Sequence, residues 1–133
     1  MKLVDANIII RFLTRDDKQK AEKCKKLFEA AAKGTVSLYI SDLVVAELVW
    51  VLHKFYACNK TVIREMIDVI LNTPNLIFDN KEIVSESVVL FEVRNVDFID
   101  AYHVALMRKR SIRKIYSFDR DFDSFPEIER IEP

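Results

Sequence analysis

The chain is poor in glycine, proline and cysteine. Its 133 residues include one Gly, three Pro and two Cys. So little glycine leaves little room for long flexible loops, and we expect many helices joined by short connections. Cys24 and Cys58 have no paired metal-ligand spacing, and no cluster of Cys or His provides a zinc site. We therefore expect the two cysteines to be buried or half-buried thiols in a reducing cytosol.

The chain also lacks a charge excess and a long apolar run. Lys+Arg and Asp+Glu both number 21, so the net charge argues neither for nor against a nucleic-acid partner. No apolar run approaches the roughly 20 residues of a membrane span. The first residues show no basic region followed by an apolar stretch, the pattern of a secretion signal. We expect a cytoplasmic protein that has no membrane partner.

Short β-type runs alternate with helical patterns along the whole chain. The runs predicted as strands lie at residues 3–4, 36–40, 76–78, 115–118 and 128–131. Predicted helices begin after Asp16 or Asp17, Ser41, Asn59 or Thr61, Asn80, and Asp97. The lone Gly34 is expected at a left-handed helix end. Strands separated by long helices need crossover connections, so we predict one α/β domain over 1–133. Its sheet would be mainly parallel with about five strands and have helices on both faces.

Four carboxylates stand where such a fold would gather its strand ends: Asp5, Glu47, Asp100 and Asp119. Each has strongly apolar neighbours, among which an unpaired charge costs several kcal/mol to bury. No basic residue lies in the segments Val4–Asp5, Ser41–Glu47, Asp97–Ala101 and Tyr116–Asp119, so a shared cation is favoured. Ligands of parallel sheets bind at the carboxyl ends of the strands. Oxygen ligands suit Mg²⁺ or Mn²⁺, so we predict a divalent-metal site and chemistry on phosphate.

Each acidic residue also has a simpler interpretation. Asp97 is expected to cap its helix, whether or not it contacts metal. Asp100 could be a first-turn carboxylate that the helix dipole favours. Glu47 could be an ordinary exposed helical residue, and Asp5 could only start a turn. Taken one at a time these signals are weak, and the metal site depends on their order and spacing.

Four strings around these carboxylates follow one another in order: Val4–Asn7, Ser41–Glu47, Asp97–Leu106 and Ser117–Phe122. Together they resemble the PIN-domain ribonucleases, and within that family the VapC-like toxins of prokaryotic toxin–antitoxin pairs. The resemblance covers nearly the whole chain. It implies that Asp5, Glu47, Asp100 and Asp119 form a metal-binding quartet, with Asp97 as an extra acidic position. It also implies support from Asn7 and Ser117, while Asp121 either caps the turn before Phe122 or supports the site.

The resemblance implies metal-dependent hydrolysis of RNA phosphodiester bonds by activated water. Asp5, Glu47 and Asp100 are the expected ligands, and Asp119 holds a second ion or orients the water. Without metal, repulsion should make at least one carboxylate hold its proton more tightly. A homodimer and an antitoxin partner are implied as well.

Arginine, histidine and tryptophan side chains near the acidic segments have other expected roles. Arg11 and Arg120 are neighbours of the acidic segments and are the candidates for RNA-phosphate contacts. For His53 and His103 we expect core packing or a tautomeric hydrogen bond rather than catalysis. Trp50 near the end of the Glu47 helix is a candidate for a hydrophobic groove.

Two other functions remain open. A haloacid-dehalogenase-like phosphatase also begins with Asp after its first strand, but it needs a second Asp where this chain has Asn7. A PIN-like domain could instead be a non-catalytic module that binds RNA or protein. The sequence does not indicate the RNA target, the preferred metal or the antitoxin.

Overall fold

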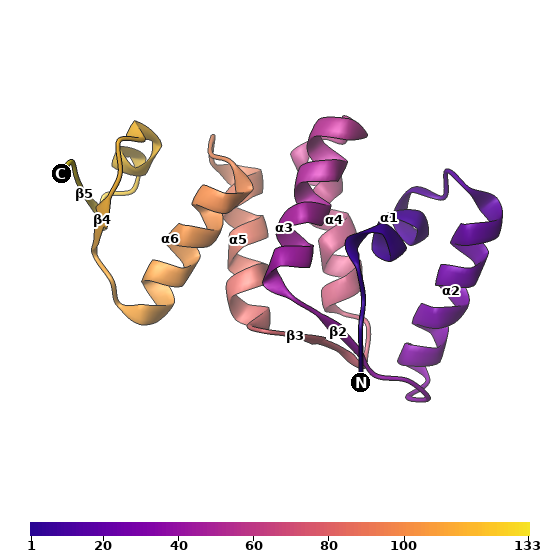
Figure 1. The fold of residues 1–133 in the computed structure, drawn as a ribbon. Coiled ribbons are helices and arrows are strands. Elements are labelled where there is room, and N and C mark those ends of the chain that lie inside the picture. Colours follow the sequence, from indigo (N-terminus) through magenta and orange to yellow (C-terminus); the bar gives the residue numbers. More distant parts are fainter.

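The computed structural model describes residues 1–133 and contains two small parallel sheets (Figure 1). The first sheet has the order β1-β2-β3, formed by Lys2–Leu3, Leu38–Ile40 and Leu76–Phe78. Its register places Leu3 beside Tyr39 and Tyr39 beside Ile77. The second sheet pairs β4 (Lys114–Tyr116) with β5 (Glu129–Ile131). All five predicted strands are thus present, and every strand pair is parallel.

Six α-helices connect and flank the strands: α1 Ala6–Thr14, α2 Lys18–Ala32, α3 Asp42–Trp50, α4 Lys60–Leu71, α5 Lys81–Val93 and α6 Phe98–Arg110. Side-chain oxygens of Asp17, Ser41, Asn59 and Asn80 accept backbone N–H groups of the helices that follow them. These caps are confirmed where the sequence predicted them. Gly34 has φ +82° just beyond α2, which confirms the predicted left-handed position.

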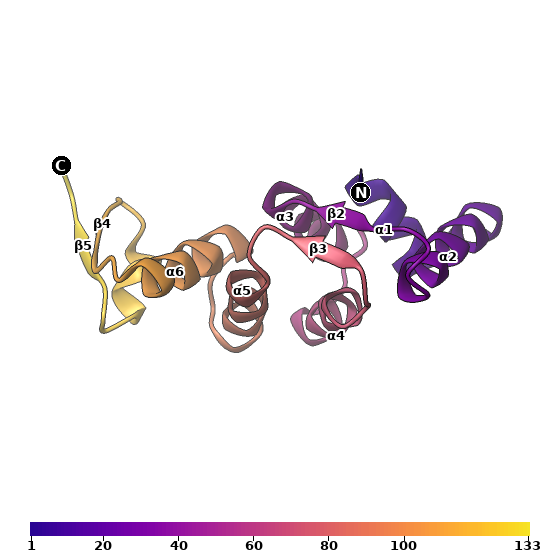
Figure 2. The ribbon, with the colours of Figure 1, turned by 90° about the horizontal axis from the view of Figure 1, so that it is seen from below.

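The single sheet predicted from the sequence is wrong. Strand β4 pairs with β5 and not with β1, so the strands form two sheets. In both views β4 and β5 lie at one end of the molecule, with α5 and α6 between them and the first sheet (Figures 1 and 2). Periodicity predicts that a segment is a strand, but it carries no information about which distant strand becomes its neighbour.

The buried side chains form one hydrophobic cluster of 33 residues. Ile40, Leu48, Ile63 and Phe91 are almost fully buried within it. Cys24 is buried and Cys58 is half-buried, and both are free thiols, as predicted. None of the helices combines the length and the apolar character needed to cross a membrane.

Two short segments have helix types that were not predicted, and the first of them continues the helix predicted after Ser41. A π-helical turn, η1 (Val51–Phe55), continues directly from α3. A 3-10 helix, η2 (Arg120–Ser124), fills most of the connection between β4 and β5. Both segments carry side chains of the candidate site, and π-turns within helices are frequent at functional sites.

Candidate metal centre

Three carboxylates form one cluster at the start of α6 and the end of β4. One oxygen from each of Asp100, Asp119 and Asp121 lies within 4.8 Å of the others. Asp100 is in the first turn of α6, Asp119 follows β4, and Asp121 is in η2. Asp100 is half-buried, whereas the other two are exposed. Oxygen atoms at this spacing fit a hard divalent cation.

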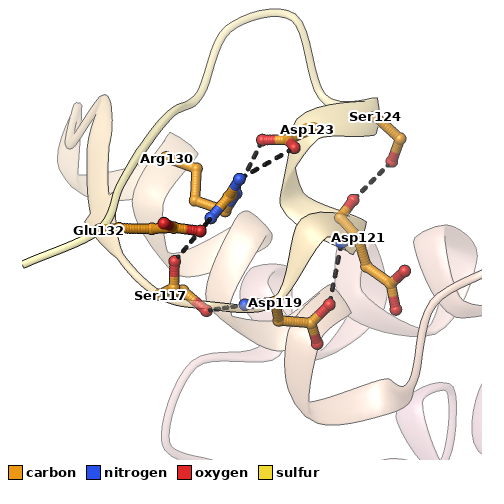
Figure 3. Close-up of polar contacts among 7 residues, drawn as sticks. All are labelled: Ser117, Asp119, Asp121, Asp123, Ser124, Arg130 and Glu132. Carbon is orange, nitrogen blue, oxygen red and sulfur yellow. Dashed lines mark hydrogen bonds and ion pairs between the residues drawn. The ribbon is translucent and has the colours of Figure 1, made fainter.

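A short chain of hydrogen bonds holds the segment that carries Asp119 and Asp121 (Figure 3). The backbone N–H of Asp119 donates to Ser117 Oγ at 3.0 Å. The N–H of Asp121 donates to Asp119 Oδ1 at 2.9 Å, so Asp119 caps η2. The prediction that Asp121 caps this turn is therefore wrong, because Asp119 already holds that N–H. The Asp121 carboxylate instead belongs to the cluster.

Arg130 on β5 contacts the segment that carries Asp119 and Asp121 (Figure 3). Its Nε lies 2.9 Å from Asp123 Oδ1, and its Nη1 donates to the Ser117 carbonyl oxygen at 3.0 Å. Nη1 also lies 2.8 Å from Glu132 Oε1, and only 12% of the Arg130 side chain is exposed. Asp123 and then Glu132 raise the pKa of Arg130. Nothing in the residue pattern indicated this contact beyond an arginine inside a short predicted strand.

Electrostatic repulsion is concentrated at Asp100. Burial raises the pKa of its carboxyl above the usual value, and the charges of Asp119 and Asp97 raise it further. His103 opposes this shift. The raised pKa of Asp100 has the direction expected for a carboxylate that holds its proton more tightly without metal, but burial rather than repulsion is its largest cause. A bound cation would remove the repulsion and favour loss of this proton.

A cavity of about 310 Å³ lies against the cluster. Its wall comes from the end of α3, from η1 and from the start of α6, and it includes the side chains of Trp50, His53, Lys54, Phe91, Asp97, Asp100 and Asp119. Acidic, basic and apolar side chains thus line the same cavity. Such mixed walls are typical of sites that bind a ligand through a few polar groups.

Asp97 and His53 have specific places in this cavity. Asp97 stands at the N-terminal cap position of α6, as predicted, but its side chain makes no capping hydrogen bond. Its exposed carboxylate is therefore available to a ligand. His53 is half-buried against the ring of Phe91, with centroids 5.3 Å apart at 90°. Burial is the main cause that lowers the pKa of His53, which favours a neutral imidazole.

Asp5 and Glu47 lie outside the acidic cluster. Asp5 Oδ1 accepts the N–H of Ala6 at 2.9 Å and caps α1. Glu47 is exposed on α3. The structure therefore unites two members of the predicted quartet, Asp100 and Asp119. Asp5 is separate because it ends β1, and β1 is not beside β4.

The remaining predicted residues fall into two places. Asn7 and Arg11 line a different cavity, and Arg11 Nη1 lies 2.8 Å from Asp16 Oδ1. Ser117 and Arg120 flank Asp119, where Ser117 supports its backbone. His103 is exposed, so core packing, one of the two roles expected for it, is wrong, and the tautomeric hydrogen bond stays a prediction. His103 lies one helical turn beyond Asp100 and faces that charge.

Fold and site thus define a small α/β protein with a carboxylate cluster suited to a divalent cation. The PIN domain family model matches residues 2–128. The chain belongs to the PIN domain family, which removes the haloacid-dehalogenase-like alternative.

Two VapC ribonucleases and one solved structure are similar to this chain. A VapC ribonuclease of Aquifex aeolicus (strain VF5) is 28% identical over 122 residues, 92% of this chain and 90% of that protein. Ribonuclease VapC13 of Mycobacterium tuberculosis (strain ATCC 25618 / H37Rv) is 28% identical over 98% of this chain and 99% of its own length. The crystal structure of Mycobacterium tuberculosis VapC20, titled a sarcin-ricin loop cleaving toxin, aligns over the full length of both chains. Its TM-score is 0.42 at 19% identity.

Proposed function

We propose that this chain is a Mg²⁺- or Mn²⁺-dependent endoribonuclease, the toxin of a VapBC-like toxin–antitoxin pair in the cytoplasm. The observation that carries the proposal is the cluster of Asp100, Asp119 and Asp121 beside a cavity. Family membership and the relatives named as ribonucleases support the reaction type. The whole chain, residues 1–133, would act as one nuclease domain.

Asp100 and Asp119 would hold the metal, joined by Asp97 from the cavity wall. Asp5 and Glu47 would complete the ligand set once their segment is brought to the cluster. A bound ion would supply a polarised water and charge stabilisation at the phosphate. Asp100 would release its proton when the ion binds, while Ser117 and Arg130 keep Asp119 in place. Asp121 would accept hydrogen bonds from water next to the ion.

RNA would enter by the cavity that contains the cluster. Lys54 lies on its wall, so its charge is better placed than that of Arg11 to contact a phosphate. Arg11 is already paired with Asp16. Arg120 follows Asp119 directly and remains a candidate contact. Ionic contacts of this kind make nucleic-acid affinity depend on salt.

A cognate antitoxin and a second copy of the chain are the proposed protein partners. Exposed apolar side chains lie on α3 and η1, at Leu43, Trp50 and Phe55. Leu43 and Trp50 are seven residues apart, so they share one face of α3. Because Trp50 also lines the cavity, an antitoxin segment covering this face would obstruct the entrance for RNA.

Cleavage of cellular RNA with added Mg²⁺ or Mn²⁺ tests the proposed function. Asp100→Asn should reduce the rate at least about 100-fold, because charge stabilisation of the transition state is lost. Glu65→Gln is the matched control, since Glu65 is exposed on α4 and makes no ion pair. Wild-type protein that leaves RNA intact with either metal would refute the nuclease activity.

A non-catalytic RNA- or protein-binding module is the second candidate. The observation in its favour is that Asp5 and Glu47 stand apart from the carboxylate cluster. Intact RNA after long incubation, together with RNA binding that Asp100→Asn leaves unchanged, would favour this module over the nuclease.

A further inference from the structure

Strand β1 has one unpaired edge. The N–H groups of Lys2 and Val4 donate to Ser37 and Tyr39 at 3.0 and 2.9 Å, so both point toward β2. Backbone groups alternate in direction along a strand, and the N–H and C=O of Leu3 therefore face away from β2. No strand lies on that side, because β1 is the end strand of its sheet. The side chain of Leu3 is 68% exposed.

Strand β4 has a matching open edge. The Arg113 carbonyl accepts the N–H of Glu129 at 2.8 Å, and the N–H of Ser117 donates to Ile131 at 3.1 Å. Both residues thus face β5, and Tyr116, one residue before Ser117, directs its backbone to the other side. Tyr116 and Phe118 are 73% and 71% exposed. An edge with apolar side chains like this is a template for pairing with another strand.

The two open edges are far apart within one chain. Helices α5 and α6 lie between the first sheet and the β4–β5 pair in both views (Figures 1 and 2). The accessible surface is 8060 Å², whereas a compact monomer of 15.6 kDa exposes roughly 7,200 Å². The excess, about 800 Å², is near the roughly 800 Å² that each partner buries in a stable interface.

We propose that two copies of this chain exchange their C-terminal strands, with β1 of one copy paired in parallel with β4 of the other. Two such contacts related by a two-fold axis would cover both open edges of both copies. Each joined sheet would have the order β3-β2-β1-β4-β5, with all strands parallel like the existing pairs. This is the five-stranded sheet that the sequence predicted, assembled from two chains.

The exchange would also complete the metal centre, a part of the inference that rests on the proposed function. In the joined sheet the strand order reverses between β1 and β4, which is where open parallel sheets bind ligands. Asp5 ends β1, and Asp119 follows β4. Each centre would therefore combine Asp5 and Glu47 of one copy with Asp100 and Asp119 of the other.

The remaining sheet edges are weaker candidates for pairing. Strand β3 is the other edge of the first sheet, and its exposed apolar residue, Ile77, is only 40% exposed. Strand β5 carries Arg130, which is engaged by Asp123 and Glu132. A partner of another kind would have to match two separate edges of this chain at once. A second copy supplies both edges from the same sequence.

Mixing two inactive variants tests the shared centre directly. Asp5→Asn and Asp119→Asn chains are each inactive alone and are unfolded and refolded together in equal amounts. Half of the dimers are then mixed, and each mixed dimer has one centre with both substitutions and one with neither. Cleavage should recover to about a quarter of the wild-type rate, as two-fold exchange requires. Cleavage that stays at the level of the separate variants would overturn the proposal.

A mass measurement separates this inference from the nuclease proposal, because it needs no activity. Analytical ultracentrifugation should give twice 15.6 kDa for the wild type and 15.6 kDa for Tyr116→Asp, whose charge cannot enter the β1–β4 contact. Ile77→Asp is the matched control and should remain dimeric. A monomeric wild type, or a Tyr116→Asp dimer, would overturn strand exchange even if RNA is cleaved. Phe118→Asp repeats the test should Tyr116→Asp fail to fold.

Discussion

The two regions that carry the predicted quartet differ in how they hold their carboxylates. In the region of β1 and α3, Asp5 makes one local capping bond and Glu47 projects into solvent. In the β4–η2–β5 region, Ser117 and Arg130 fix the segment of Asp119 by contacts from several positions. Asp119 is thus held in place by its own segment and lies beside Asp100 of α6, whereas Asp5 and Glu47 would have to be brought to the cluster.

The largest expected effect comes from substituting a carboxylate in the C-terminal region. Asp119→Asn removes the negative charge and one cluster oxygen while keeping an oxygen that can cap η2, and it should weaken both Mn²⁺ binding and RNA cleavage, the latter at least about 100-fold. Asp5→Asn should lose cleavage equally, yet it should leave Mn²⁺ binding to the monomeric Tyr116→Asp chain unchanged. Titration of Mn²⁺ by electron paramagnetic resonance measures both. Equal loss of Mn²⁺ binding in the two monomeric variants would contradict the comparison.

The next effect comes from the arginine behind the cluster. Arg130→Met removes the contacts to Asp123 and to the Ser117 carbonyl, and Mn²⁺ affinity should fall about 10-fold, as for other residues that orient ligands. Arg64→Met is the control, because Arg64 pairs with Glu92 away from the site. The same titration measures both variants. If Arg130→Met binds Mn²⁺ as tightly as the wild type, the segment of Asp119 keeps its position without Arg130.

A smaller effect concerns the stability of the metal-free protein. The pKa of Asp100 is higher in the folded protein than in the unfolded chain. Its protonation therefore stabilises the fold at a pH below the unfolded-state pKa, and this stabilisation is lost as the pH rises through the folded-state pKa. At pH 7 the ionised Asp100 therefore destabilises the fold. Asp100→Asn should raise the Tm in chelator by a few degrees, on the scale of about 1 kcal/mol. The gain should shrink toward pH 4 in calorimetry; a gain independent of pH would contradict charge repulsion as its cause.

The smallest effect concerns RNA contact. Lys54→Met should weaken RNA binding only a few-fold and reduce the slope of log affinity against log salt by about one. Arg11→Met is the matched control and should change neither quantity, because Arg11 is paired with Asp16 outside the cavity. Fluorescence anisotropy at several salt concentrations measures both variants. A larger loss with Arg11→Met would place RNA at the cavity lined by Asn7 and Arg11.

Local features of the fold could be predicted from the sequence because their partners lie close along the chain. Ser41, Asn59 and Asn80 each cap a backbone N–H three residues ahead, so residue type and spacing identify them. The neighbours of β1 and β4 could not be predicted, since periodicity does not encode pairing between distant strands.

The candidate site shows the same division. The convergence of Asp100 and Asp119 followed from strand and helix ends, and it is confirmed. Asp121 belongs to the carboxylate cluster because Asp119, and not Asp121, caps η2. The spacing of the residues did not decide between these two caps. Lys54 reaches the cavity from a π-turn, and Arg130 meets its partners only in three dimensions. Neither had a signal at the level of residue patterns.

Asp100 and Asp119 are proposed to hold a divalent cation between them. Anomalous diffraction from crystals grown with Mn²⁺ tests this proposal most directly, because the manganese signal locates the ion independently of the protein density. We expect an ion within roughly 2.0–2.3 Å of a carboxylate oxygen of each residue. Saturating Mn²⁺ that leaves both carboxylates without an anomalous peak would contradict it.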